Sequence, residues 1–173
     1  TASPSGAMAR KIELSGGAFN FAAKNSQNRS TKSISGVGAY RIAYLHPFLN
    51  HFELDVGYSL LATQTFGGDL SFGFDLGANY FFISTPGDRK TASKSSSVLL
   101  QHQWRPYFGV SFNQRNFQST SGQFAGVGVK LGTEYQFLEN LSLLGTARYI
   151  MLGGPNQSEA TQVEILLGFV VQF

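Results

Sequence analysis

The 173-residue sequence lacks cysteine altogether, and only 13% of its residues are charged. Without cysteine the chain can form no disulfide, no thiolate metal site and no cysteine nucleophile. No run of about 18 apolar residues is present, which excludes a transmembrane helix. The net charge of +3 is small and no basic stripe is visible, so we expect no nucleic-acid partner. Soluble surfaces usually carry about 25–35% charged residues, so the low charge indicates a surface that largely avoids water.

Aromatic residues and glycine are abundant, with 16 Phe, 7 Tyr and 20 Gly. The last twelve residues show how they are arranged. Every second residue from Val163 to Phe173 is apolar, whereas the positions between them include Glu164 and Gln172. Successive side chains of a strand point to opposite faces. The stretch therefore predicts a strand with one apolar face and one face that accepts a carboxylate.

The same alternation recurs in eight segments of roughly 10–14 residues, near the length that a tilted strand needs to cross a bilayer. The segments are 12–23, 34–46, 52–63, 70–83, 105–115, 123–137, 141–152 and 162–173. In the first of them the apolar positions change parity across Gly16 and Gly17, which predicts a β-bulge there.

The connectors between these segments alternate imperfectly in length. Short turns on one side and longer loops on the other are typical of membrane barrels. Counting strands from Phe173 places the termini at the same end as the connectors 47–51, 84–104 and 138–140, and places 24–33, 64–69, 116–122 and 153–161 at the opposite end. The connector 84–104 is long for its side. Val98, Leu99 and Leu100 within it predict either a missed strand or an early start of the fifth segment.

Two architectures fit the alternation, a soluble sandwich and a membrane barrel. A sandwich would expose its polar faces to water, and we would then expect many Lys, Thr and Glu on them. Those faces instead carry mostly Gly, Ser and Asn, which suit the narrow interior of a barrel of about eight strands. We therefore predict an all-β protein, a single up-and-down antiparallel transmembrane β-barrel over residues 12–173. Residues 1–11 are interpreted as a disordered tail or the remnant of an expression tag.

Acidic and basic residues alternate with the apolar ones in almost every predicted strand, and Glu13 is one of them. Charges in a narrow, partly dry interior need a partner of opposite sign or water. We therefore predict an ion-pair network that closes the lumen and fixes the strand register. Its predicted members are Arg41, Glu53, Asp55, Asp75, Lys130, Glu134, Arg148 and Glu164.

Histidine is the only other residue that suggests chemistry. His46 and His51 flank the turn at Pro47, but no third ligand with metal-site spacing is evident. A lipid-modifying hydrolase would need a Ser, a His and an acid near the outer leaflet. All three histidines instead lie in or next to the connectors 47–51 and 84–104, at the end of the barrel that we expect to face the periplasm. We predict no catalytic, metal or cofactor site.

Three stretches resemble the small eight-stranded outer-membrane β-barrels of Gram-negative bacteria, in particular the transmembrane domain of outer membrane protein A and its relatives. They are 105–110, 126–132 and 134–143. The resemblance implies a monomer in the bacterial outer membrane, in contact with membrane lipids and lipopolysaccharide. It also implies that Phe173 is the C-terminal aromatic residue that the barrel-assembly machinery recognises.

The expected function is non-enzymatic. A barrel with a plugged polar lumen would stabilise the envelope or present its surface loops to an adhesive partner. In the first long loop Lys24, Arg29 and Lys32 either contact lipopolysaccharide phosphates or are simply solvated. Two alternatives stay open, a narrow channel or small-solute-binding barrel, and a lipid-modifying outer-membrane enzyme.

Overall fold

The computed structural model describes residues 10–25, 30–49, 51–62, 70–83, 89–93, 96–99, 104–118, 122–138, 140–155 and 158–173. Ten strands occupy most of these residues. They are β1 (Lys11–Asn25), β2 (Thr31–Leu49), β3 (Phe52–Ala62), β4 (Leu70–Phe81), β5 (Arg89–Ser93), β6 (Ser96–Leu99), β7 (Trp104–Phe117), β8 (Gln123–Leu138), β9 (Leu141–Gly153) and β10 (Ser158–Gln172). Across the described ranges, no helix is long and apolar enough to span a membrane.

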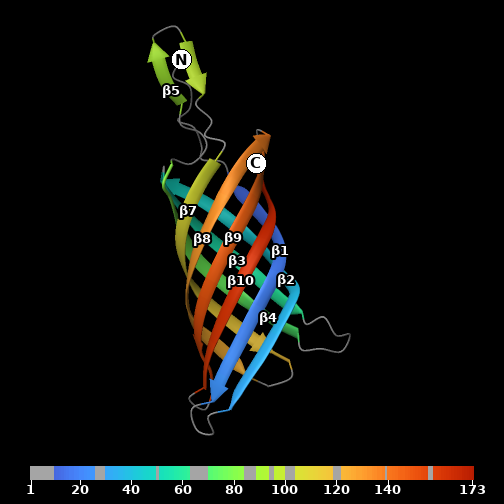
Figure 1. Cartoon of the computed structure of the whole chain (residues 1–173). Coiled ribbons are helices and arrows are strands. Elements are labelled where there is room, and N and C mark those ends of the chain that lie inside the picture. The colour runs from blue at the N-terminus through green and yellow to red at the C-terminus, as the bar shows by residue number, and fades with distance from the viewer. Residues whose placement is uncertain are drawn as a thin grey trace.

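Eight strands close into one antiparallel barrel in the order β1-β10-β9-β8-β7-β4-β3-β2 (Figure 1). Each barrel strand pairs with the barrel strands before and after it in the sequence. The first and last strands, β1 and β10, also pair with each other, beginning with Lys11 opposite Gln172, and this closes the ring. The predicted all-β, up-and-down barrel of eight strands is confirmed.

The two ends of the barrel differ. The end at which β10 finishes also holds the β2–β3, β4–β7 and β8–β9 connections, and we call it the termini end. The opposite end holds the β1–β2, β3–β4, β7–β8 and β9–β10 connections, and we call it the loop end. The sides that the sequence predicted for these connections are confirmed by the pairing.

β5 and β6 form a separate two-stranded sheet within the predicted connector 84–104. Val98 and Leu99 belong to β6, so this stretch is an additional strand and not an early start of the fifth barrel strand. β6 does not join the barrel because β4 pairs directly with β7, for example Phe81 with Tyr107, which leaves no open edge.

Several barrel strands run further than predicted. Lys11 already belongs to β1, although 1–11 was predicted as a tail. At the loop end, Lys24 lies opposite Thr31 in a β1–β2 ladder, and β10 begins at Ser158. The predicted loops 24–33 and 153–161 are therefore too long. Antiparallel pairing satisfies the backbone N–H and C=O groups whatever the side chains, so polar residues can continue a hairpin beyond its apolar part.

The register against β2 shifts between Gly17 and Phe19, but the extra residue stands on β2, since Gly17 pairs with Ala39 and Phe19 with Gly36. Against β10 the register of β1 is unbroken. Phe19 and Phe21 are buried on the same inner face as Glu13, so the apolar residues change face here and the bulge predicted in β1 itself is wrong. Gly17 is required there by a close approach to β10. A Cβ atom at this position would lie 1.9 Å from the carbonyl oxygen of Ile165.

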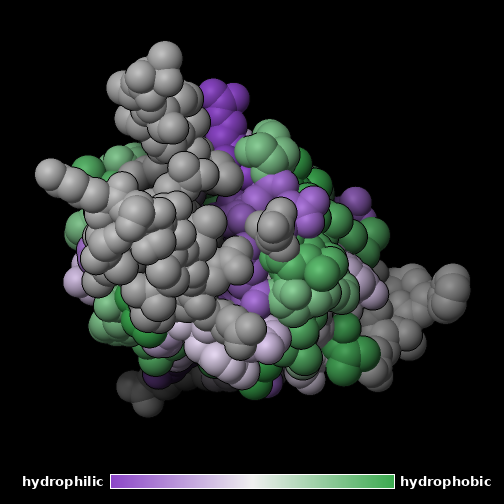
Figure 2. Space-filling view, turned by 90° about the horizontal axis from the view of Figure 1, so that it is seen from above, coloured by the Kyte–Doolittle hydropathy of each residue, from purple (hydrophilic) through white to green (hydrophobic). Residues whose placement is uncertain are grey.

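The two faces of the barrel wall have opposite chemistry. Large apolar side chains on the outer face are exposed in all eight barrel strands, up to 70% for Leu167. The inner face is buried. Figure 2, which looks onto one end of the barrel, shows hydrophilic residues near the centre with hydrophobic residues beside them.

Apolar clusters occupy both ends of the interior. The cluster at the loop end contains Phe19, Phe21, Ala39, Leu61, Phe117, Phe124, Ile150, Leu152, Ala160 and Leu166. The cluster at the termini end contains Ala43, Leu45, Phe81, Tyr107, Leu144 and Val170. Charged side chains fill the interior between and among these residues.

Candidate functional site: the charged lumen

Every barrel strand places at least one charged side chain in the interior. The buried set comprises Lys11, Glu13, Arg41, Glu53, Asp55, Asp75, Arg105, Arg115, Lys130, Glu134, Arg148 and Glu164. Six of these twelve are basic and six are acidic, so their formal charges cancel. A balanced set of this kind can be buried only if its members are paired, because an isolated buried ion is very costly.

Arg41 is the first hub of the network. Its guanidinium contacts three carboxylates, namely Glu13, Asp55 at 2.9 Å and Asp75 at 3.4 Å. Lys130 binds Asp55 from the opposite side. Strands β1, β2, β3, β4 and β8 are tied together at this point, which fixes their positions around the lumen.

Asp75 is the second hub. Its carboxylate accepts a hydrogen bond from Arg115 at 2.7 Å and lies 3.2 Å from the Arg148 guanidinium. The Ser59 hydroxyl also donates to it, at 2.5 Å. Arg148 in turn donates to Glu164 at 2.8 Å, which extends the network to β10. Charge-assisted hydrogen bonds of this kind are among the stronger ones in proteins.

A second cluster of charges lies nearer the termini end. The Lys11 ammonium sits between Glu53 at 2.5 Å and Glu134 at 2.9 Å. Arg105 reaches the same Glu134 oxygen at 2.7 Å. The ring of Phe81 lies 5.2 Å from the Lys11 ammonium and 4.6 Å from the Arg105 guanidinium carbon. These distances are within the range of cation–π attraction.

Glycine on the inner face gives the long basic side chains room. A Cβ atom on Gly109 would lie 2.4 Å from the Lys130 side chain, and one on Gly57 would lie 2.7 Å from the Arg41 guanidinium. The narrow interior thus pairs each of these bulky cations with a residue that has no side chain. This explains why the polar faces of the sequence are rich in glycine.

All eight residues predicted for the network lie in the interior, and each makes at least one ion pair with another buried charged residue. Sequence reasoning missed Lys11, Arg105 and Arg115, and it noticed Glu13 without assigning it to the network. Lys11 was missed because it was assigned to the tail. Arg105 and Arg115 stand at the two ends of the predicted segment 105–115 and share the parity of the inward-facing residues of β7, so following the alternation to both ends of that segment would have found them.

The other predicted sites are not brought together. Lys24 follows the outer face of β1, whereas Lys32 lines a cavity inside the loop end, so they do not share one surface. Arg29 lies outside the described residues. Phe173 is 65% exposed at the termini end.

The histidines that the structure describes lie at the termini end. The His51 ring contacts the carbonyl oxygen of Phe81 at 2.8 Å, and His46 lies 3.4 Å from the Tyr44 hydroxyl. His102 is outside the described residues. Within those residues, no group of three or more His, Cys, Asp or Glu is placed to hold a metal ion.

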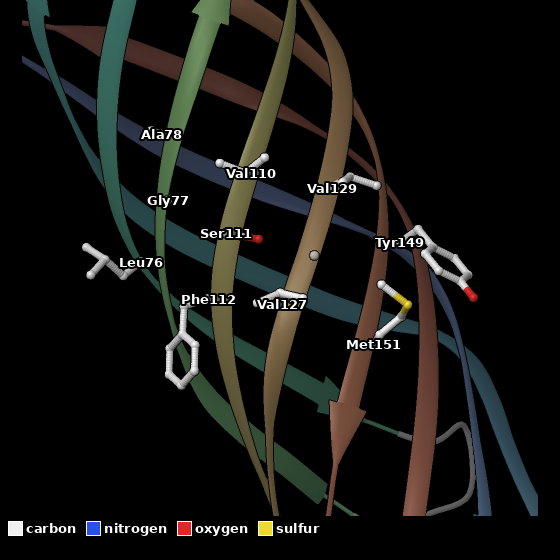
Figure 3. A pocket seen from close by; sticks show the side chains of 11 residues that line it. Leu76, Gly77, Ala78, Val110, Ser111, Phe112, Val127, Val129, Tyr149 and Met151 are labelled. Carbon is white, nitrogen blue, oxygen red and sulfur yellow. The ribbon is translucent and has the colours of Figure 1, made fainter.

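The outer wall carries an apolar hollow of about 520 Å³ over β4, β7, β8 and β9. Figure 3 shows side chains such as Phe112, Val127 and Met151 around it. None of the described residues that line it is charged. Its chemistry suits hydrocarbon chains better than water.

The fold and the interior together define a small, closed, eight-stranded antiparallel β-barrel with a polar lumen and an apolar outer wall. No protein-family model matches the sequence, and no curated protein does. Several solved structures are similar in fold to this chain, and two of them are bacterial barrels. Neisserial surface protein A gives a TM-score of 0.66 at 20% identity over 95% of this chain and 97% of its own. The N-terminal β-barrel domain of Pseudomonas aeruginosa OprF gives 0.59 at 17% identity over 98% of this chain and 100% of its own. At these identities the likeness shows the fold.

Proposed function

We propose that this chain is an integral β-barrel of the bacterial outer membrane with a plugged lumen. Its role is non-enzymatic: it stabilises the envelope or presents its loops to a partner. The observation that carries the proposal is the reversed distribution of polarity, with apolar side chains outside and ion pairs inside. The similarity of the fold to outer-membrane barrels supports the same location.

The outer face argues for lipid. Leu131 and Ile165 are each 60% exposed and Leu167 is 70% exposed. Contiguous apolar surface of this extent is unusual on a soluble monomer. In a bilayer the same surface meets acyl chains, and alternation of lipid-facing and lumen-facing residues is the pattern of membrane barrels.

Aromatic side chains gather on the outer wall at the termini end. Phe52 and Tyr80 have ring centroids 5.1 Å apart, and Trp104 and Tyr135 have theirs 4.7 Å apart. Aromatic rings are enriched where membrane meets water. This supports a membrane interface at the termini end, which we place on the periplasmic side.

The plug follows from which strands the ion pairs join. Lys130 of β8 reaches Asp55 of β3, Lys11 of β1 reaches Glu134 of β8, and Arg148 of β9 reaches Asp75 of β4. In each case two other strands lie between the partners on the shorter way around the barrel. The pairs therefore cross the lumen and do not follow its wall, which obstructs a water path.

Three partners remain proposals. Lipopolysaccharide would meet the outer wall near Lys24, the barrel-assembly machinery would recognise Phe173, and a further partner would contact the loops. We propose a monomer, since eight strands close the barrel without a second chain.

Two measurements separate this function from its alternatives. In planar bilayers, the purified protein should give no steady conductance, because paired charges cross the lumen. A steady open level would favour the narrow channel. Incubation with lipopolysaccharide should leave the acyl chains unchanged by mass spectrometry, and altered acylation would contradict the non-enzymatic role.

A further inference from the structure

The loop end of the interior holds a cavity of about 190 Å³ that is separate from the charge network. Its apolar lining includes Phe21, Ala23, Ile34, Phe117 and Phe124, and Lys32 stands at its edge. The three phenylalanines belong to the apolar cluster of the loop end. The plugging role proposed above uses none of these residues.

The three rings form a mutual aromatic contact. The centroid of Phe21 lies 4.4 Å from that of Phe117 and 5.5 Å from that of Phe124, and the last two are 5.9 Å apart. Two of these contacts are edge-to-face, at 82° and 88°. Edge-to-face and offset contacts are the arrangements that aromatic rings prefer. A further ring in the cavity could extend this packing.

The size of the cavity limits the guest. An apolar protein cavity of roughly 150 Å³ is large enough to bind benzene. The cavity here is therefore suited to one aromatic ring and too small for a full acyl chain.

The edge of the cavity supplies a positive charge. Lys32 is exposed and extends from β2 on the inner side, next to the apolar lining. Lys24, on the neighbouring strand β1, faces outward and does not line the cavity. An apolar well beside one ammonium group fits a molecule with a ring at one end and a negative charge at the other.

We propose that the loop end of the lumen binds a small aromatic carboxylate. Its ring enters the well against Phe21, Phe117 and Phe124, and its carboxylate meets Lys32. The described residues that line the site lie in barrel strands or beside them, as Gly122 and Pro155 do, and none belongs to the charge network. The inference therefore stands apart from the role of the plugged lumen and from the side of the membrane that the loop end faces.

The test uses the full chain in lipid nanodiscs and 4-fluorophenylacetate as the probe, with empty nanodiscs as the blank. Binding is followed by the broadening of the ¹⁹F signal. Ala23→Leu fills the well and should weaken binding at least about tenfold. Ala22→Leu, one residue away on the other face of β1, is the matched control and should leave the affinity within about twofold.

The charge is tested with Lys32→Gln and its control Lys24→Gln. Lys32→Gln should weaken binding of the carboxylate about fivefold, and should leave binding of neutral 4-fluorobenzyl alcohol unchanged. No broadening above the blank, or equal affinity in Ala23→Leu and Ala22→Leu, would overturn the site. Equal effects of the two lysine substitutions would overturn the assignment of Lys32. Each variant is checked for folding on gels, where a folded barrel migrates differently before and after boiling (a heat-modifiable band).

Discussion

Asp75 carries more of the ion-pair network than any other single carboxylate described, since Arg41, Arg115 and Arg148 all approach it. Its partners depend on it, because a buried guanidinium group is costly without a carboxylate. Burying a salt bridge brings little net stability, but removing one partner strands the other charge. We therefore expect the network to select one strand register and one way of closing the barrel, whatever it contributes to the free energy of unfolding.

Asp75→Ala should lower the free energy of unfolding by about 3–5 kcal/mol, because it removes a shared carboxylate from three buried guanidinium groups. Arg115 is affected most, since its remaining carboxylate contact is with Glu164 at 3.8 Å. The measurement is urea unfolding of the protein in lipid vesicles. Ser111→Ala is a control on the inner face. The Ser111 hydroxyl contacts Asn113 and takes no part in the ion pairs, so the substitution should cost about 1 kcal/mol. An equal decrease in the free energy of unfolding for the two variants would indicate that water in the lumen solvates the charges, which contradicts the dry network.

Gly17→Ala should destabilise the barrel by about 1–3 kcal/mol, because the added methyl group would meet the backbone of β10 and force it to shift. Gly145→Ala is the control. A Cβ atom there would lie 3.6 Å from the nearest atom, a side-chain carbon of Leu167. We expect that variant to unfold at the same urea concentration as the parent. A tolerant Gly17 would contradict the tight β1–β10 closure.

At the scale of the strand, the alternation of faces determines what a substitution meets. Leu76, at the middle of β4, points outward, and its neighbour Asp75 points into the network. Two neighbouring residues of one strand therefore have opposite surroundings: one side chain lies on the outer wall and the other lies among buried ion pairs.

Leu76→Arg should cost about 2–4 kcal/mol in bilayers if this residue lies near the membrane midplane, whereas Leu138→Arg, at the end of β8, should cost about 0–1 kcal/mol. Both leucines are exposed on the outer face, at 49% and 55%, so burial in protein does not separate them. Unfolding titrations in vesicles measure the difference. Equal and small costs would argue that the outer wall meets water.

The β5–β6 sheet should be dispensable for the barrel. β4 and β7 pair directly without it. Replacing residues 84–103 with a short turn should leave the urea midpoint and the heat-modifiable band unchanged. A lost band would show that this connector takes part in closing the barrel.

At the scale of the whole molecule, the even number of barrel strands puts both ends of the barrel chain on one side. If the loop end faces outward, trypsin added to intact cells should cut near Arg29 and spare Lys90. Cells with a permeabilised outer membrane are the control, in which Lys90 becomes accessible. Cleavage at Lys90 in intact cells, with Arg29 protected, would reverse the orientation.

Much of this architecture could be predicted from the sequence, because a two-residue period records which face of a strand is apolar. That period predicted the strand number and eight members of the network, but it misplaced Phe19 and Phe21, which are apolar and yet face the interior. It could not give the partners. Which carboxylate Arg41 contacts depends on shear and closure of the barrel, and these are set by all eight strands together.

The ends of the strands were harder to predict for a different reason. Lys24 and Ser158 are polar and look like loop residues, but both lie in strand ladders: Lys24 pairs with Thr31 across the β1–β2 hairpin, and Ser158 pairs with Asn25 of β1. The cavity at the loop end was also invisible in the sequence. Phe21, Phe117 and Phe124 come from three strands, and only the closed barrel brings their rings together.

The central claim, an outer face in lipid around a closed polar interior, is tested most directly by spin labels on β7. The chain has no cysteine, so single cysteines at Phe108, Val110, Phe112, Ser111 and Asn113 can each be labelled cleanly in bilayers. The three outward positions should be accessible to oxygen and protected from a water-soluble nickel chelate, and the two inward positions should be protected from both. High accessibility of the outward positions to the chelate, or no alternation along the strand, would contradict the account.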